Sequence, residues 1–334
     1  MQEQINIITP VYNGEHLIHR LLDSLLIQTY SFVTMYVVDD GSTDKTKSVI
    51  EHYIPLFEKK GYKLCYIYQE NGGQSAALNR GLKYVNGDYL LWPDADDWYK
   101  TPDAIETMVN VIRQTGDDVG IARCQLEFVD EETMEITYTT AFSPCDKPCD
   151  LLEDAVYGIH DFLYAPIEWI AKVKFLDTYI RNREIYVNKN AGQNVQILFP
   201  YLGYSKCVTI DKTLCCYLVR KKSHSHIQRD YENQITHCEA QLDAYVYTTK
   251  NMDVLSEEQK DKYITFRRTY YCNEILNIDY EHANRIGFRE HYKKYRLRKI
   301  KINKRYCRLW IWTYFASIIS YKNIQKLINH LKLV

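Results

Sequence analysis

Apolar runs alternate with segments of helical periodicity through the first hundred residues of the chain. Four runs are rich in the β-branched and aromatic residues typical of strands: INIITPVY, TMYVVDD, KLCYIYQ and DYLLWPD. Between them, segments such as residues 15–28 repeat apolar side chains every three or four positions, which indicates amphipathic helices. This alternation predicts βαβ units and an α/β fold, with a mostly parallel central sheet covered by helices on both faces.

Polar residues collect where each of these runs ends. The four clusters are Thr9–Asn13, Asp39–Asp44, Glu70–Gln74 and Asp94–Asp97. Open α/β sheets bind ligands at the carboxyl ends of their strands, so we expect the clusters to converge on one crevice. Neither a GxGxxG fingerprint nor a GxxxxGK[ST] loop follows the first strand, which argues against simple nicotinamide enzymes and P-loop ATPases.

The stretch LLWPDADDWY changes from an apolar run to three aspartates within four positions. Carboxylate oxygens are preferred ligands of Mg²⁺ and Mn²⁺, and such a site leaves positions open for phosphate oxygens. An EF-hand is a poor alternative, because Tyr99 stands where that loop needs glycine and Ile105 where it needs glutamate. The plain alternative is a solvated turn whose aspartates cap a helix.

Bulk composition indicates an ordinary folded protein. The chain has 334 residues, a net charge of −1 and 46% apolar residues, so it is neither disordered nor a general polyanion binder. Its ten cysteines show no zinc-site spacing and are expected to be reduced structural thiols. The N-terminus does not resemble a signal peptide, and no run reaches the ~18 apolar residues of a spanning helix. We therefore expect a cytoplasmic protein.

Four ordered motifs carry a family resemblance. TPVYNG, VDDGSTD, ENGGQSAALNRGL and DADD resemble the N-terminal half of family 2 glycosyltransferases with the GT-A fold, closely over residues 4–100 and more loosely to about 230. The resemblance implies a Rossmann-like GT-A domain and inverting transfer of a sugar from a nucleotide-diphosphate donor, with UDP as the expected nucleotide. The predicted division is a nucleotide-sugar half at 1–100, an acceptor half at 101–229 and a helical extension at 230–334.

The resemblance also implies roles for the four clusters. The donor-binding residues would be Thr9, Val11 and Tyr12 beside the nucleoside, Asp39 accepting from uracil, Asp40 supporting that loop, Asn71 and Arg80 beside the base and diphosphate, and Asp94 facing the ribose or the water shell of the metal ion. Asp96 would coordinate Mn²⁺ or Mg²⁺ in a D-x-D motif. A divalent cation on the diphosphate would neutralise charge that develops on the departing nucleotide.

The second half of the chain alternates less regularly. We predict a helix over 101–114, strands within 117–130 and 135–140, a helix over 151–164 and a strand within 165–177. The family resemblance places an acidic pair, which supplies the general base, where this chain has Gln193 and Asn194. An amide has no useful basicity, and loss of a positioned base costs about 10²–10⁴ in rate.

Three explanations for the missing acid remain open. Asp97 or Glu168 would replace it as the base, or the two amides would bind acceptor or donor sugar while a base comes from elsewhere. The third explanation is a degenerate protein that binds without turnover. In the non-enzyme reading, the chain is a sugar-nucleotide-binding subunit. A nucleotidyltransferase is the other enzyme alternative, although TPVYNG lacks the glycine-rich and basic loop of that class.

A basic loop follows the next predicted strand, in TIDKTLCCYLVRKKSHSH. Arg220, Lys221 and Lys222 would contact the diphosphate, and His224 or His226 would complete the metal shell or pair with phosphate. The alternative is a solvated basic loop.

Charged amphipathic helices are predicted from about residue 230, and a basic stretch follows them. Residues 293–308 hold nine Lys or Arg and no acid, and LWIWTYFASII comes next. Anionic headgroups contribute about 1 kcal/mol per basic residue near the surface, so this stretch predicts peripheral attachment to the inner face of the cell membrane. A helical cap is the alternative; nothing elsewhere supports nucleic-acid binding. A membrane location suits a saccharide or lipid-linked acceptor in cell-surface polysaccharide synthesis.

Overall fold

The computed structural model describes residues 3–142, 148–160, 162–220, 230–297, 300 and 302. The chain divides into two compact units. The first comprises Met1–Gln228 with Asp243–Lys260, and the second comprises Arg229–Leu242 with Asp261–Val334. The domain boundaries expected from composition stay predictions.

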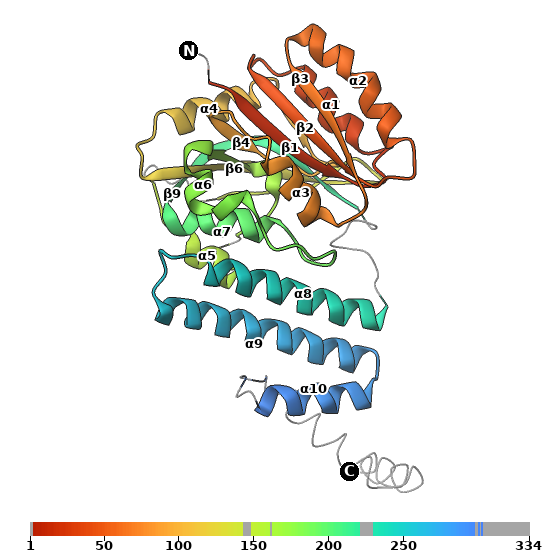
Figure 1. Cartoon of the computed structure of the whole chain (residues 1–334), viewed down its shortest axis with the longest axis vertical. Coiled ribbons are helices and arrows are strands. Elements are labelled where there is room, and N and C mark those ends of the chain that lie inside the picture. The colour runs from red at the N-terminus through yellow and green to blue at the C-terminus, as the bar shows by residue number, and fades with distance from the viewer. Residues whose placement is uncertain are drawn as a thin grey trace, which may run out of the picture. The chain divides into compact units, whose positions relative to one another are not determined.

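The first hundred residues form the predicted parallel half of a sheet (Figure 1). Its strands are β1 (Ile5–Val11), β2 (Val33–Asp40), β3 (Lys63–Gln69) and β4 (Tyr89–Leu91), in the spatial order β3-β2-β1-β4. Every neighbouring pair among them is parallel. β1 and β2 are buried along their whole length, which explains why their sequences read as continuous apolar runs.

Three helices connect these strands: α1 (Ile18–Leu26), α2 (Thr46–Lys60) and α3 (Gln74–Leu82). α1 and α2 pack against each other, whereas α3 packs against β1 and β2. Since crossovers between parallel strands are right-handed, the reversal of strand order after β3 places α3 on the face opposite α1 and α2. The same reversal opens a crevice at the carboxyl ends of the strands.

The second half of the sheet mixes strand directions. Its strands are β5 (Trp98–Tyr99), β6 (Val119–Asp130), β7 (Ile136–Thr139), β8 (Trp169–Lys172) and β9 (Lys206–Val219). β8 lies antiparallel between β4 and β6, β6 pairs parallel with β9, and β5 and β7 pair antiparallel with β9 and β6. The described strands thus form one nine-stranded mixed sheet, of which only the first half is purely parallel.

Short helices cover this second half. They are α4 (Ala104–Arg113), α5 (Leu152–Tyr157), α6 (Leu176–Tyr179) and α7 (Asn194–Tyr204), with 3₁₀ turns η1 (Pro166–Glu168), η2 (Val173–Phe175) and η3 (Arg181–Arg183). The helix predicted over 151–164 is too long by seven residues at its end. Gly158 ends α5 in the left-handed conformation at φ 62°, and its N–H bonds the Asp154 carbonyl.

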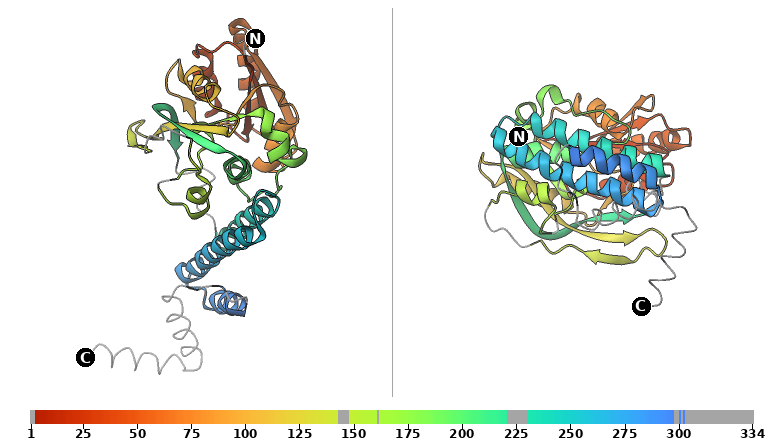
Figure 2. Two further views of the ribbon diagram at one scale, coloured as in Figure 1. Left: turned by 90° about the vertical axis from the view of Figure 1, so that its left-hand side faces the viewer. Right: turned by 90° about the horizontal axis from the view of Figure 1, so that it is seen from below.

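The second unit is helical. It contains the start of α8 (Tyr231–Lys250), most of α9 (Glu257–Glu281) and α10 (Arg285–Leu297), which lie side by side (Figure 2). Its core includes Ile235 from α8, Leu276 from α9 and Phe288 from α10. The predicted C-terminal helices are confirmed.

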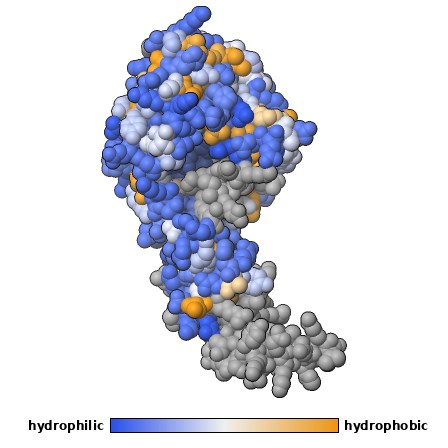
Figure 3. Space-filling view, turned by 90° about the vertical axis from the view of Figure 1, so that its right-hand side faces the viewer, coloured by the Kyte–Doolittle hydropathy of each residue, from blue (hydrophilic) through white to orange (hydrophobic). Residues whose placement is uncertain are grey.

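Long apolar helices are absent from the part of the chain described here: none is long and apolar enough to cross a membrane. On the face shown in Figure 3, hydrophilic residues predominate and hydrophobic ones occur in small groups. Of the basic stretch 293–308, the structure describes residues 293–297, 300 and 302; LWIWTYFASII lies outside the described residues.

Candidate active site

The ends of β1 and β2 form the first wall of the crevice. Val11, the last residue of β1, pairs with Asp39 in the parallel ladder. Asn13 Oδ1 accepts the backbone N–H of Thr43 at 2.8 Å, which connects the two loops beyond these strands. Tyr12 is 54% exposed between them. An open tyrosine ring beside a buried carboxylate suits a flat heterocycle.

The carboxylate of Asp39 is oriented by two donors. Its Oδ1 accepts the backbone N–H of Ser42 at 2.8 Å, and its Oδ2 accepts the hydroxyl of Tyr66 at 2.7 Å. Each carboxylate oxygen has a second lone pair, so Asp39 retains capacity for a ligand N–H. Thr9 lies deeper in β1, where its hydroxyl is fully buried and has no hydrogen-bond partner among the described residues.

Asp40 holds the glycine loop that precedes α3. Its carboxylate accepts the backbone N–H groups of Gly72 and Gly73 at 2.9 and 2.8 Å. Its backbone carbonyl accepts Asn71 Nδ2 at 3.0 Å. Asp40 and Asn71 therefore connect the polar loop after β2 to the glycine loop before α3. The polar groups of both side chains bind protein groups in this structure. The expected supporting role of Asp40 extends to the loop before α3.

Asp94 connects the glycine loop to the aspartate cluster. Its Oδ1 accepts Gln74 Nε2 at 2.7 Å and Gln193 Nε2 at 3.4 Å. Burial, followed by the charge of Asp96, raises the pKa of Asp94 to about 7. With this bond, all four clusters expected at the strand ends are connected by hydrogen bonds into one rim. The predicted convergence is present in the structure.

Asp96 forms an ion pair with Arg220. The guanidinium donates from Nε to Asp96 Oδ2 at 2.7 Å and also from Nη2, and both side chains are more than four-fifths buried. β9 brings Arg220 to the cluster because its end is attached there: the Leu218 N–H donates to Asp97 Oδ1 at 3.0 Å. A cation thus already compensates the charge of Asp96.

The two carboxyl groups proposed as replacement bases are fully buried. Oδ2 of Asp97 and both oxygens of Glu168 have no hydrogen-bond partner among the described residues. Burial raises the pKa of both groups well above the usual carboxyl range, and the nearby Arg123 only partly offsets this for Glu168. Because both side chains are fully buried, neither carboxyl group can contact the hydroxyl of an acceptor in this conformation.

The two amides stand at the start of α7, beside the cluster. Gln193 precedes the helix, is buried and donates to Asp94, whereas Asn194 is its first residue and has a buried Oδ1 without a partner among the described residues. The structure therefore places Gln193 at the carboxylate cluster, and the roles expected of the two amides stay predictions. Its amide positions Asp94 and cannot remove a proton.

One predicted donor residue stands apart from the crevice. Arg80 is exposed in the last turn of α3, about 9 Å along the helix axis from Gln74 at its start. The structure thus places Arg80 six residues along α3 from Gln74, and its assignment to the donor stays a prediction. Lys222, His224 and His226, and Lys221 between Arg220 and Lys222, lie outside the described residues.

The donor set suits a hard divalent cation. In the described part of the chain, three His, Cys, Asp or Glu side chains nowhere converge in a ready-made metal cage. Asp94 and Asp96 nevertheless present carboxylate oxygens two residues apart. Burial, followed by the charge of Asp96, raises the pKa of Asp94, and a bound cation would relieve the repulsion between the two carboxylates. Such a two-carboxylate site suits Mg²⁺ or Mn²⁺ that keeps water and takes phosphate oxygens.

Sequence reasoning missed two residues of the site. Gln74 was placed in a polar cluster without a role, and Tyr66 was one residue of the third strand. Gln74 is the N-terminal residue of α3. Because this helix begins at the strand ends, the Gln74 side chain lies close to Asp94. Tyr66 contacts Asp39 because β2 and β3 pair in register, and no local pattern encodes that contact.

Known proteins share both the sequence and the fold. Residues 6–163 match the model of the family described as Glycosyl transferase family 2. GlyA of Streptococcus pneumoniae is 36% identical over 230 residues, which are 68% of this chain and 32% of GlyA. An uncharacterised glycosyltransferase of Rickettsia typhi is 37% identical over 134 residues, 40% of each chain. The chain thus spans less than half the length of these curated relatives.

Two solved structures share the fold at low identity. S. aureus TarS 1-349 in complex with UDP-GlcNAc has a TM-score of 0.56 and 21% identity, covering 85% of this chain and 75% of TarS. The mannosyltransferase PcManGT from Pyrobaculum calidifontis, in complex with GDP-Man and Mn²⁺, has a TM-score of 0.52 and 15% identity, covering 96% of this chain and 82% of that one. Through residues 6–163, this chain belongs to glycosyl transferase family 2.

Proposed function

We propose that this protein transfers a hexosyl or N-acetylhexosaminyl group from a nucleoside-diphosphate sugar, with UDP as the nucleotide, to a saccharide or lipid-linked acceptor with inversion. The observation that carries the proposal is the hydrogen-bonded rim. It joins an exposed tyrosine and oriented carboxylate at one end to a carboxylate pair and an arginine at the other. TarS bound to UDP-GlcNAc and PcManGT bound to GDP-Man and Mn²⁺ support a nucleotide-sugar donor.

The nucleoside would bind at the ends of β1 and β2. Tyr12 offers its ring to the base, and Asp39, held by Ser42 and Tyr66, accepts a ring N–H. Asp40 and the glycine loop fix the distance from this base site to Asp94. Because the carboxylates are oriented before the donor arrives, little ordering is required on binding.

The diphosphate would bind beside Asp96 and Arg220. Asp96, with Asp94 beside it, would hold Mg²⁺ or Mn²⁺, which when bound neutralises charge on the leaving nucleotide. The Arg220 guanidinium, which donates from Nε and Nη2 to Asp96 Oδ2, would donate its remaining N–H groups to a phosphate oxygen. Asp96 Oδ1 would bind the cation, since one carboxylate can accept a guanidinium on one oxygen and hold a metal ion through the other.

Transfer also requires an acceptor for the proton of the attacking hydroxyl. Gln193 cannot serve because an amide has no useful basicity, and Asp97 and Glu168 are fully buried carboxyl groups whose pKa is raised by that burial. The structure therefore favours the reading in which the amides at the start of α7 bind and position, while the base comes from elsewhere. The specific observation is the bond from Gln193 to Asp94.

The experiment that tests the proposal measures UDP binding and UDP release with Mn²⁺. We expect the wild-type chain to bind UDP more tightly with Mn²⁺ than with EDTA, and Asp96→Asn to lose that difference. Lys206→Ala is the matched control, since Lys206 pairs with Asp118 at the start of β9 and its removal should leave UDP affinity unchanged. Equal UDP affinity of wild type and Asp96→Asn in Mn²⁺ would refute the metal assignment.

The same assay separates the enzyme from a sugar-nucleotide-binding subunit. The absence of a carboxylate at Gln193 and Asn194 is the observation that favours the binding subunit. Release of UDP from a panel of UDP-, GDP- and dTDP-sugars, with or without an acceptor, supports the enzyme. Tight binding of a donor with no hydrolysis or transfer across the panel favours the binding subunit.

A further inference from the structure

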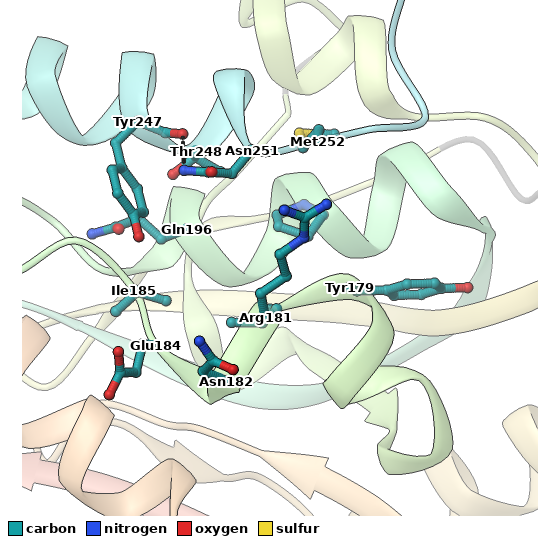
Figure 4. Close-up of a pocket in the computed structure, with 12 residues that line it drawn as sticks. Tyr179, Arg181, Asn182, Glu184, Ile185, Gln196, Tyr247, Thr248, Asn251 and Met252 are labelled. Carbon is teal, nitrogen blue, oxygen red and sulfur yellow. Dashed lines mark hydrogen bonds between the residues drawn. The ribbon is translucent and has the colours of Figure 1, made fainter.

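A second recess lies apart from the strand ends, within the first unit. It is a pocket of about 220 Å³ between η3, α7 and the end of α8 (Figure 4). Asn182 and Glu184 line one side, Gln196 of α7 lines the second, and Tyr247 and Asn251 line the third. The donor site described above uses none of these residues.

The lining suits a neutral polyhydroxyl ligand. The side chains of Asn182 and Glu184 and the hydroxyl of Tyr247 make no hydrogen bond with the residues that the structure describes. The tyrosine ring is 42% exposed, which offers an apolar face beside these polar groups. The lining cation, Arg181, is paired with Asp253. Amide, hydroxyl and carboxylate groups around one aromatic face provide the hydrogen bonds and the flat apolar contact of a sugar ring.

The wall that carries Asn182 is strained and firmly held. Asn182 and Arg183 both adopt the left-handed conformation, at φ 55° and 54°. Two successive non-glycine residues in this region persist only when their surroundings hold them. The Arg183 guanidinium holds this turn in place, because it donates to Asp177 at 2.6 Å and to the Val85 carbonyl. The strained turn presents Asn182 to the pocket.

The opposite wall is attached equally firmly. Met252 packs so closely on Gly203 that a Cβ there would lie 2.2 Å from its terminal methyl carbon. The backbone N–H of Asp253 donates to the Tyr204 hydroxyl at 2.9 Å, and the Asp253 carboxylate pairs with Arg181, which lines the pocket. The pocket is therefore formed before any ligand binds, which lowers the ordering cost of binding.

The pocket and the donor crevice share α7 and the loop before it. Gln196 lies one helical turn, about 5 Å, beyond Gln193, which contacts Asp94. The loop runs from the pocket to α3, where Ile185 exchanges two hydrogen bonds with Asn79 at 2.8 and 2.9 Å. A saccharide unit in the pocket would thus be a remote part of a chain whose end reaches the crevice.

We propose that this pocket is a subsite for a neutral saccharide unit of the acceptor, distant from the reacting hydroxyl. The proposal rests on the glycosyltransferase function proposed above. Binding energy from a remote, non-reacting unit would orient the acceptor end for transfer. Glu184 and the Asn182 amide would bind hydroxyl groups, and Tyr247 would stack on the ring face.

The test uses the full chain with saturating UDP and Mn²⁺, which fill the donor crevice, and saturation-transfer NMR with four probes: methyl glycosides of glucose, galactose, rhamnose and N-acetylglucosamine. We expect saturation transfer to at least one probe. Asn182→Gly removes the amide and relieves the left-handed strain, so the variant should fold. Both Asn182→Gly and Tyr247→Ala should lower the saturation-transfer signal about fivefold or more. Tyr138→Ala, at a tyrosine on β7 that is 51% exposed, is the control and should have no effect.

Absence of saturation transfer to all four probes, or equal transfer in wild type, Asn182→Gly and Tyr247→Ala, would overturn the subsite. UDP affinity distinguishes this from failure of the proposed function. If the function holds and the subsite does not, wild type binds UDP with Mn²⁺ dependence while the probes give no variant-sensitive signal. If the donor assignment fails instead, Mn²⁺-dependent UDP binding is absent, whereas the probe signals still respond to Asn182→Gly.

Discussion

Single carboxyl groups in this protein differ sharply in what surrounds them. Asp39 and Asp40 receive hydrogen bonds from backbone N–H groups and side chains, and Asp96 pairs with an arginine. Glu168 accepts no hydrogen bond from the described residues, and burial raises its pKa although Arg123 lies near. Single residues therefore differ in which carboxyl groups are oriented for a ligand and which are enclosed in the core.

Glu168 provides a direct test of this distinction. Glu168→Gln preserves the shape of a protonated carboxyl, so we expect sugar transfer to change less than about threefold, because Glu168 is not the proton acceptor. Asp97→Asn is the parallel variant and should behave in the same way. A loss of about 10² or more in kcat for either variant, with unchanged UDP affinity, would instead identify that residue as the base.

Asp94 predicts a dependence of stability on pH. Its pKa is raised in the folded state from 3.8 to about 7, so between these values the unfolded chain releases a proton that the native protein keeps. This group's contribution to the free energy of unfolding therefore falls as pH rises from about 4 to 7 and is constant above. Asp94→Asn removes the effect, so in EDTA the variant should gain about 1–3 kcal/mol over wild type between pH 5 and pH 8 by urea unfolding. A difference that does not vary with pH would contradict the assignment.

At the scale of elements, loops between strands and helices decide how the site is built. Gly73 joins β3 to α3 at φ 90°, where its N–H bonds Asp40. A Cβ at this position would lie 2.8 Å from the Cα of Lys189, in the loop before α7. One glycine therefore allows the donor loop and the loop before α7 to approach each other.

Gly73→Ala should accordingly damage both stability and donor binding. We expect a loss of about 2 kcal/mol or more in the free energy of unfolding, from left-handed strain and the backbone clash together, and weaker UDP binding. Gly61→Ala is the matched control: Gly61 has φ 85°, but a Cβ added there would meet no atom within 4 Å. It should lose only about 1 kcal/mol and keep its UDP affinity. Equal losses for the two variants would show that the approach of Lys189 is unimportant.

On the scale of the whole molecule, the basic stretch 293–308 of the second unit bears on where in the cell the protein acts. The expectation of a membrane surface stays a proposal, supported by the nine basic residues of 293–308 and the aromatic run that follows. Truncation after Lys293 should abolish sedimentation with vesicles of phosphatidylglycerol and phosphatidylcholine, while UDP affinity is unchanged because the crevice lies in the first unit. Sedimentation that persists undiminished after truncation would refute the attachment.

Much of the fold was predictable because it is encoded locally. The β1–α1–β2–α2–β3–α3–β4 alternation follows from periodicity, and its polar strand ends meet because parallel strands place their carboxyl ends at one edge. The extent of α5 was not predictable from apolar spacing, since Gly158 ends the helix in the left-handed conformation. The family resemblance assigns Arg80 to the base and diphosphate side, and the structure adds that it lies exposed in the last turn of α3.

The sequence alone determined the family, the parallel half of the sheet and the aspartate cluster, because each depends on residues near one another in the chain. Tertiary structure decided which charges are paired and which groups are buried. Arg220 reaches Asp96 across 124 positions and Gln193 reaches Asp94 across 99, through strand pairing and the loop before α7 that no local pattern specifies. The raised pKa of Asp97 and of Glu168 follows from burial, which is a property of the packed molecule.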